Sequence, residues 1–306
     1  MELHQLKYFC AIADTGSFSR AAHQAHVSQP SLSQQIGKLE DELGTRLFDR
    51  LGRSVRLTEL GKLFLARARS VLRDLESARN DIVEKKTAMT GSIAVGAIPT
   101  IAPYLLPQVL ATFSRKWAQA HVTVVEEITP FLLEKLRAGA VDVAIVALPV
   151  PVRNQEFESF PLMTEKMFAV LPKRHELAGR REVSLGELHS QPFLLLRDGH
   201  CFRETAVEAC KRARLNPQIV FESGQFSSIL SMVCAGLGVS VVPAMAVEKR
   251  AGCCFIPLAD QRAERTIGAV TLKGRSLTRA STQFLAHLGV KPARNGNGNG
   301  QAAARN

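Results

Sequence analysis

The chain has 306 residues, a formal net charge of +11 and six cysteines, which is long enough for two or three domains with a sizeable core. No apolar run approaches the roughly 20 residues of a membrane span, and the N-terminus lacks the basic and apolar segments of a signal peptide. The irregular cysteine spacing argues against a secreted disulfide framework. We therefore expect a cytoplasmic protein that does not enter the membrane.

The N-terminal region has the pattern of a helix-turn-helix. Apolar residues recur at helical spacing over residues 3–13, which predicts a first helix. Ser17 can cap a second helix over about residues 18–24. Ser28 can cap a third helix, with Pro30 in the first turn, where a missing N–H is tolerated.

The third helix would present a polar face that is rich in hydroxyl and amide groups. Such groups can bind base edges in the major groove, or phosphates, as a recognition helix does. A following hairpin over residues 47–57 would form a wing whose tip could reach a minor groove. The alternative is a three-helix packing module with an ordinary polar face. The candidate DNA-binding residues are Gln29, Pro30, Ser31, Ser33, Gln34, Lys38 and, at the tip of the wing, Arg53.

The charge of the chain supports nucleic-acid binding only locally. Residues 1–90 carry 14 basic and 11 acidic residues, so most of the positive excess lies elsewhere. Residues 44–73 are more basic, but a basic run is about as often a solvated face as a binding surface.

An apolar stripe continues from Thr58 to about Lys86, with no proline and no glycine after Gly61. This pattern predicts one long helix. Because the other faces carry charge, the helix has no domain of its own to bury the stripe, and we expect it to pack against a second copy. Dimeric DNA readers bind paired half-sites, so a dimerising helix fits this position.

Buried strands alternate with helices after residue 90, which predicts an α/β domain with a parallel sheet. The chain ends in a low-complexity tail over residues 296–306, which we expect to be disordered. The predicted strands are 92–98, 122–126, 141–146, 167–171, 193–196, 218–221 and 239–242, and the predicted helices are 103–117, 131–138 and 228–235.

Three polar positions follow the ends of predicted strands. Thr100 follows the first strand, Thr129 the second, and His200 with Cys201 follows the strand over residues 193–196. Ligands of open α/β sheets lie beyond the carboxyl ends of strands. We therefore expect these residues to line one crevice.

Cys201 lies at the start of a further predicted helix. Asp198 can cap that helix near Gly199, which would place the thiol among unpaired N–H groups at the positive end. His200 and Arg203 can add positive charge. Each effect favours the thiolate, which is the form that attacks peroxide.

Cys210 lies nine positions after Cys201 on the same predicted helix. An intact helix would separate the two residues by about 13.5 Å and place them on opposite faces, whereas a disulfide needs Cα atoms within about 7 Å. A disulfide would therefore require residues 202–209 to unwind, as a bistable regulatory element does. The alternative is two ordinary buried cysteines.

Several motifs resemble the LysR-type transcriptional regulators, and together they cover nearly the whole chain. They are residues 17–22, 27–33, 36–40, 47–50, 57–61 and 235–239. The resemblance implies an all-α winged helix-turn-helix over 1–58, a dimerising linker helix over 59–89, and an α/β effector domain over 90–295 with two lobes like periplasmic binding proteins. Lobe I would span about 92–161 plus 267–295, and lobe II about 162–266. Tetramers are also implied.

Within that family, a second set of positions resembles the OxyR-type peroxide sensors: 98–100, 103–107, Thr129, 198–201, Cys210 and 265–268. The resemblance implies that Cys201 is the peroxidatic thiol and Cys210 the resolving thiol. It also implies a peroxide pocket shaped by Thr100, Thr129, His200 and Arg203, with Arg265 in support.

The favoured function is a DNA-binding regulator that senses hydrogen peroxide through Cys201 and a Cys201–Cys210 disulfide, and not an enzyme. The alternative is a LysR-type regulator that responds to a small metabolite between the lobes. A thiol peroxidase is a third hypothesis, against which the DNA-binding half argues.

The expected partners are double-stranded promoter DNA, hydrogen peroxide and further copies of the chain in a dimer or tetramer, with RNA polymerase as a further candidate. No cofactor is expected, and no metal, because the histidines lack ligand spacing. The other cysteines are interpreted as small hydrophobic residues; they are Cys10, Cys234, Cys253 and Cys254.

Overall fold

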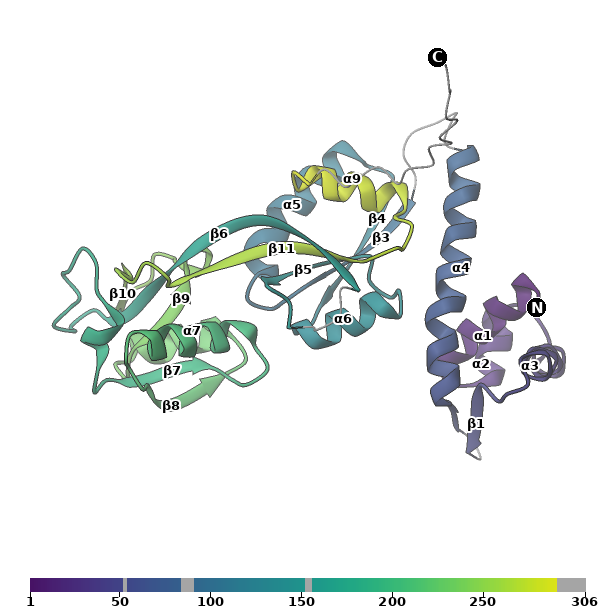
Figure 1. Cartoon of the computed structure of the whole chain (residues 1–306), viewed down its shortest axis with the longest axis horizontal. Coiled ribbons are helices and arrows are strands. Elements are labelled where there is room, and N and C mark those ends of the chain that lie inside the picture. Colours follow the sequence, from purple (N-terminus) through teal and green to yellow (C-terminus); the bar gives the residue numbers. More distant parts are fainter. Residues whose placement is uncertain (52–53, 84–90, 152–155, 291–306) are drawn as a thin grey trace, which may run out of the picture.

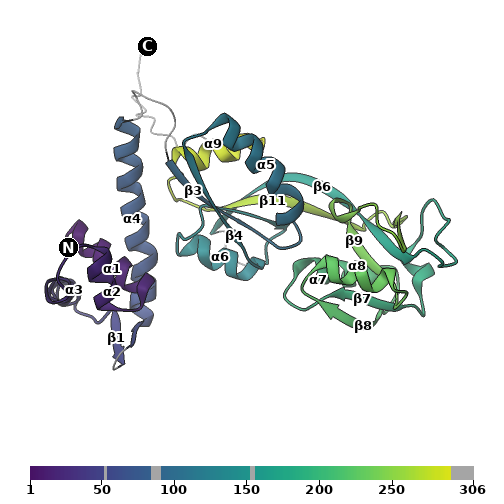
Figure 2. The same cartoon turned by 180° about the vertical axis from the view of Figure 1, so that it is seen from behind.

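The computed structural model describes residues 1–51, 54–83, 91–151 and 156–290. It consists of a helical N-terminal unit, a long helix beside it, and two α/β lobes in a row (Figures 1 and 2). None of the helices in these ranges is long and apolar enough to cross a membrane. Arg53, which is expected at the tip of the wing, and the tail over 296–306 lie outside the described residues.

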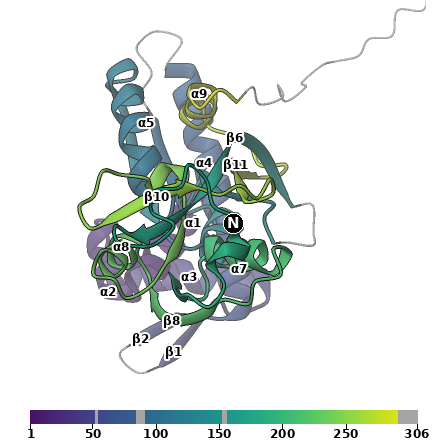
Figure 3. The same ribbon diagram turned by 90° about the vertical axis from the view of Figure 1, so that its left-hand side faces the viewer.

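The N-terminal unit has the predicted order of three helices and a hairpin. Ser17 and Ser28 cap the second and third helices, and their hydroxyls accept hydrogen bonds from the N–H groups of Arg20 and Ser31. The hairpin projects from the helices (Figure 3). The elements are α1 (Leu3–Thr15), α2 (Phe18–Gln24), α3 (Gln29–Leu43), β1 (Phe48–Leu51) and β2 (Ser54–Leu57).

The linker helix α4 (Glu59–Val83) packs against this unit, so the expectation that it has no partner in its own chain is partly wrong. Ala68 is buried, and Phe64 lies edge-on to the buried Phe9 with ring centroids 5.1 Å apart. The apolar side chains on the outer face, in contrast, are 45% to 64% exposed; they are Leu60, Leu63, Val71 and Leu75. Residues 84–89 of the predicted helix lie outside the described ranges.

Lobe I is a mixed sheet covered by helices, with its strands in the order β6 (Phe157–Pro172), β11, β5, β3 and β4. The β3 strand runs parallel to β4 and β5, as predicted, but β11 is antiparallel to both β5 and β6. The expectation of a wholly parallel sheet is therefore wrong. The elements are β3 (Gly91–Ala97), α5 (Ala102–Lys116), β4 (Ala120–Glu126), α6 (Thr129–Arg137), β5 (Val143–Leu148), β11 (Glu264–Leu272) and α9 (Arg279–His287).

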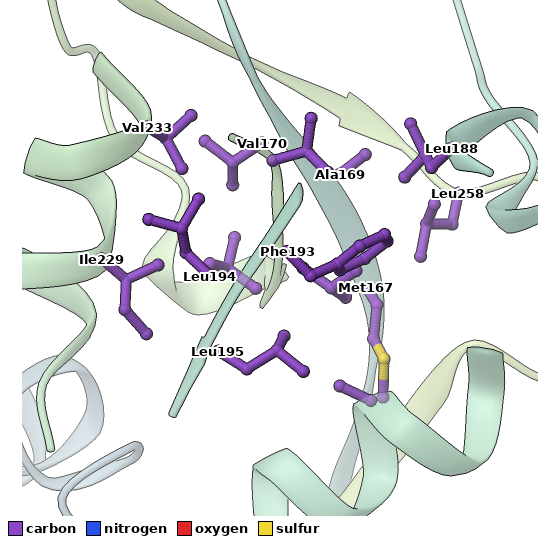
Figure 4. Close-up of a cluster of buried hydrophobic side chains, with 14 of the residues drawn as sticks. Met167, Ala169, Val170, Leu188, Phe193, Leu194, Leu195, Ile229, Val233 and Leu258 are labelled. Atoms are coloured by element: carbon purple, nitrogen blue, oxygen red, sulfur yellow. The ribbon is translucent and has the colours of Figure 1, made fainter. Parts of the chain in front are cut away.

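Lobe II is built on the second half of β6 (Phe157–Pro172), which pairs with β9 and β10. Its core gathers around Phe193 and Leu194 of β7, Met167 of β6, and Ile229 and Val233 of α8 (Figure 4). The other elements are η1 (Leu185–Leu188), β7 (Pro192–Leu196), α7 (Cys201–Arg212), β8 (Gln218–Ser223), α8 (Phe226–Cys234), β9 (Ser240–Pro243), η2 (Ala244–Ala246) and β10 (Cys253–Pro257).

The chain passes between the lobes in β6 and β11, which are paired from Glu264–Lys166 to Leu272–Phe157. The hydrophobic clusters on either side of this ribbon are separate. The two-lobed α/β architecture with an N-terminal helix-turn-helix is therefore confirmed.

Gly61 provides a test of how α4 joins the N-terminal unit. A Cβ at Gly61 would lie 2.1 Å from the carbonyl oxygen of Leu47, so Gly61→Ala must push the helix off the hairpin and should destabilise the protein by about 1–3 kcal/mol. Gly37 in α3 has no atom within 4 Å of the same position, so Gly37→Ala should stabilise it by about 1 kcal/mol. Urea unfolding measures both, and equal stability of the two variants would contradict the contact.

Candidate functional site

Helix α7 begins at Cys201 and includes Cys210, as predicted. Its N-cap is His200, without a side-chain cap hydrogen bond, so the expectation that Asp198 caps this helix is wrong. The Asp198 carboxylate instead lies 2.5 Å from Arg203, where it is mostly exposed.

Arg203 also binds Glu222, at 2.7 Å, so its guanidinium serves two carboxylates. Its positive charge is thus paired with Asp198 and Glu222, and not with the Cys201 thiol as expected.

The Cys201 side chain lies at the seam between the lobes. It is half-buried and packs against the hydrophobic cluster of lobe I, whereas the next residue, Phe202, is buried in the cluster of lobe II. Its surroundings come from three elements: Thr129 at the start of α6, the backbone of Ala147 in β5, and Arg265 in β11. The first turn of α7 therefore contacts the hydrophobic clusters of both lobes.

Burial raises the pKa of Cys201, and this effect outweighs all the others. The positive charge of Arg265 lowers the pKa in part, as do the Thr129 side chain and the Ala147 backbone, while Glu204 raises it. Desolvation therefore favours the neutral thiol and opposes the effects that were expected to favour the thiolate. The groups that would stabilise the anion are nevertheless in place around it.

His200 is held in its neutral form. Burial lowers its pKa, and the positive charge of Arg197 lowers it further, so the expectation that it adds positive charge is also wrong. Its Nε2 atom is buried without a hydrogen-bond partner among the described residues, and so is Oγ1 of Thr129. The Thr129 hydroxyl lies close enough to the thiol to lower its pKa, but the two do not form a hydrogen bond of ordinary geometry.

A buried ion pair fixes Arg265 beside this site. Its Nε lies 2.7 Å from Oε1 of Glu165, and the two side chains are only 1% and 3% exposed. The guanidinium also donates to Oγ1 and to the carbonyl oxygen of Thr100, both at 3.0 Å. It lies over the Phe202 ring at 5.0 Å, and the other Glu165 oxygen accepts from the Met245 N–H.

Sequence reasoning missed Glu165, although it is the counter-ion of Arg265. Glu165 and Arg265 are direct partners in the register of β6 and β11. The two residues are 100 positions apart, so no local pattern connects them. Glu165 also lies outside the predicted strand over residues 167–171, so the sequence offered no direct signal that it is buried.

Cys210 is fully buried in the core of lobe II, away from the seam. Burial, with a smaller effect of Asp260, raises its pKa to about 11. The thiol is therefore protonated and shielded while α7 is intact.

Two family comparisons decide what kind of protein carries this site. Residues 3–62 match the family described as bacterial regulatory helix-turn-helix protein, lysR family, and residues 86–291 match the LysR substrate binding domain. The chain belongs to the LysR family. It is therefore a regulatory helix-turn-helix protein rather than an enzyme.

Among individual relatives, the chain is similar to proteins named for peroxide. It is 36% identical over 281 residues to a hydrogen peroxide-inducible genes activator of Dickeya chrysanthemi, covering 90% of this chain and 91% of the relative. A full-length OxyR variant from Pseudomonas aeruginosa is similar in structure, with a TM-score of 0.80, 33% identity and 94% coverage of both chains. A hydrogen-peroxide-bound OxyR mutant of Corynebacterium glutamicum gives a TM-score of 0.62 and 34% identity, covering 94% of this chain and 91% of that one.

Because the pair between Arg265 and Glu165 is buried, neutralising Glu165 should destabilise the protein more than neutralising an exposed glutamate. Glu165→Gln leaves the buried Arg265 charge without a counter-ion, and should cost about 3–5 kcal/mol of unfolding free energy. The matched control is Glu156→Gln, which removes the partner of Arg137 in a pair whose side chains are 42% and 32% exposed; it should cost less than about 1 kcal/mol. Urea unfolding of the full chain measures both, and similar losses would contradict the assigned role of the buried pair.

Proposed function

We propose that this protein is a transcriptional regulator that senses hydrogen peroxide by oxidation of Cys201, followed by a disulfide with Cys210. One observation carries the proposal most directly. Two buried polar atoms without hydrogen-bond partners among the described residues lie on this part of the fold: Oγ1 of Thr129, whose side chain acts on the Cys201 thiol, and Nε2 of His200, the residue before Cys201. Such atoms suit a small polar ligand that can both donate and accept hydrogen bonds. The names of the similar proteins support peroxide as that ligand.

The surroundings of Cys201 suit attack on a peroxide. In that step the sulfur forms a bond to one peroxide oxygen, the O–O bond breaks, and the leaving oxygen takes protons to become water, which gives sulfenic acid. The thiol proton must leave first, and the positive charge of Arg265 stabilises the anion as it forms. Because burial keeps the Cys201 thiol protonated at rest, we infer that Cys201 reacts only when peroxide binds beside it.

The second step joins two residues that the reduced fold keeps apart. The Cys210 thiol would attack the sulfenic sulfur of Cys201, forming an S–S bond and releasing water. Intact α7 separates the residues by about 13.5 Å along its axis, so residues 202–209 must unwind. A sulfenic oxygen in contact with the apolar cluster of lobe I would loosen the start of α7, since an unpartnered polar group is unfavourable there.

Phe202 opposes this unwinding. Its side chain is fully buried, lies edge-on to Phe226 with centroids 5.2 Å apart, and lies beneath the Arg265 guanidinium. Withdrawal of this ring would break the aromatic contact and uncover the ion pair between Arg265 and Glu165. We therefore propose that oxidation of Cys201 is transmitted to both lobes through Phe202.

For the DNA-binding half, we propose that α3 enters the major groove. The α3 candidates are exposed on one side of the unit, apart from Ser33, which is half-buried; the exposed residues are Gln29, Pro30, Ser31, Gln34 and Lys38. The exposed apolar face of α4 would join two copies, and further contacts would complete a tetramer. Promoter DNA and RNA polymerase in the cytoplasm complete the proposed set of partners.

One observation favours the alternative function, a LysR-type regulator that responds to a small metabolite bound between the lobes. A cavity of about 480 Å³ lies between β5, α7 and β11, and its charged lining includes Glu204, Glu208, Arg212 and Arg262. A small zwitterion would complement such a lining. A ligand-dependent rise in melting temperature without thiol oxidation would support this second function.

Serine variants separate the two thiol steps. Cys201→Ser should abolish the peroxide-dependent change in DNA footprint while the reduced protein still binds DNA. Cys210→Ser should still react, and dimedone should trap sulfenic acid on Cys201, but the protease sensitivity of residues 202–209 should stay low. Cys254→Ser is the matched thiol control and should behave like the parent. A full conformational change in Cys210→Ser would mean that sulfenic acid alone is the signal.

Two substitutions on α3 should affect DNA binding differently. Lys38→Ala removes an exposed charge suited to phosphate, and should weaken binding to all sequences and reduce the salt slope by about 0.9. Gln34→Ala removes an amide suited to a base edge, and should change the preference among sequences by about 1–3 kcal/mol. Titrations at several salt concentrations with operator and mutated operator measure both. Unchanged affinity in both variants would remove α3 from the DNA interface.

A further inference from the structure

Two other cysteines meet in lobe II. Cys234 is the last residue of α8, and Cys253 is the first residue of β10. The residue before Cys253 is Gly252, where a Cβ would lie 3.1 Å from Cβ of Cys234 and 3.2 Å from its carbonyl oxygen. The end of the helix therefore lies directly on the start of the strand, and the glycine leaves no side chain between them.

The two side chains interact with each other. The Cys234 side chain acts together with burial to raise the pKa of Cys253 to about 12. Cys253 is 8% exposed, whereas Cys234 is half-buried and accessible to a small reagent. The neighbouring Cys254 is engaged elsewhere, because its thiol donates to the carbonyl oxygen of Leu171 at 3.6 Å.

We propose that Cys234 and Cys253 are a second redox-active pair, which closes to a disulfide on reaction with a peroxide, independently of Cys201. The accessible Cys234 sulfur attacks one peroxide oxygen, the O–O bond breaks, and sulfenic acid and water form. The Cys253 thiol then attacks the Cys234 sulfur, which forms the S–S bond and releases a second water.

Closure of this pair needs no unwinding, unlike closure of the pair in α7. Helix α8 ends at Cys234, and the chain returns over residues 235–252 to place Cys253 beside it. Because the two residues lie on different elements, no helix has to unwind before the two sulfurs can approach each other. The positive charge of Arg250 offsets the raised pKa of Cys253 only in part, because burial and the Cys234 side chain have the larger effects.

The bond would fasten one end of α8 to β10. The other end of the same helix carries Phe226, whose ring contacts Phe202 next to Cys201. A closed Cys234–Cys253 pair would therefore stiffen the lobe that must repack when α7 unwinds.

The test uses the full-length Cys201→Ser protein, so that failure of the Cys201 mechanism cannot affect the result. The folded protein is treated with excess hydrogen peroxide, remaining thiols are alkylated, and a non-reduced tryptic digest is analysed by mass spectrometry. We expect a linked species that joins peptide 215–249, which contains Cys234, to peptide 251–262. Absence of this species while the protein stays folded by circular dichroism would overturn the proposal.

Because Cys253 and Cys254 share one tryptic peptide, single variants assign the bond. In the same background, Cys253→Ser should abolish the linked species and Cys254→Ser should retain it. Should the buried Cys253→Ser change impair folding, Cys234→Ser at the accessible position must give the same loss. A link that survives Cys253→Ser or disappears in Cys254→Ser would overturn the pairing.

Discussion

The ion pair between Arg265 and Glu165 is the constraint on which the site depends. Each charge is buried, and a buried charge is tolerated only when its hydrogen-bonding groups are matched. The partners that match them are Thr100 after β3, the backbone of Met245, and the Phe202 ring in α7. Together they fix parts of both lobes around one guanidinium. The position of the Cys201 thiol follows, because α7 begins where those elements meet.

The start of α7 combines two opposite demands. The Cys201 side chain joins the apolar cluster of lobe I, while Phe202 joins that of lobe II, so the reduced helix is held by burial on both sides. Burial also keeps the thiol neutral, against the positive charge of Arg265. A change in the polarity of the Cys201 sulfur therefore acts where the hydrophobic cores of the two lobes meet. A small change in packing at this point affects both lobes.

Local features of the chain were predictable, and long-range ones were not. The caps at Ser17 and Ser28 depend on residues three positions away, and both were predicted. The Asp198 cap is not formed, and the carboxylate pairs with Arg203 instead. The resting state of Cys201 could not be predicted, since its burial depends on lobe packing. Glu165 could not be found, because strand register alone brings it to Arg265.

The ribbon of β6 and β11 also has a mechanical consequence. Its two strands are hydrogen-bonded to each other as they pass from one lobe to the other, so the lobes resist being pulled apart, whereas a narrow ribbon yields readily to torsion. At Gly268, where the register shifts, a Cβ would lie 2.4 Å from Leu148, so this part of the ribbon is locked to lobe I. A rearrangement in lobe II that acts through this ribbon would therefore reach lobe I mainly as rotation about the ribbon axis.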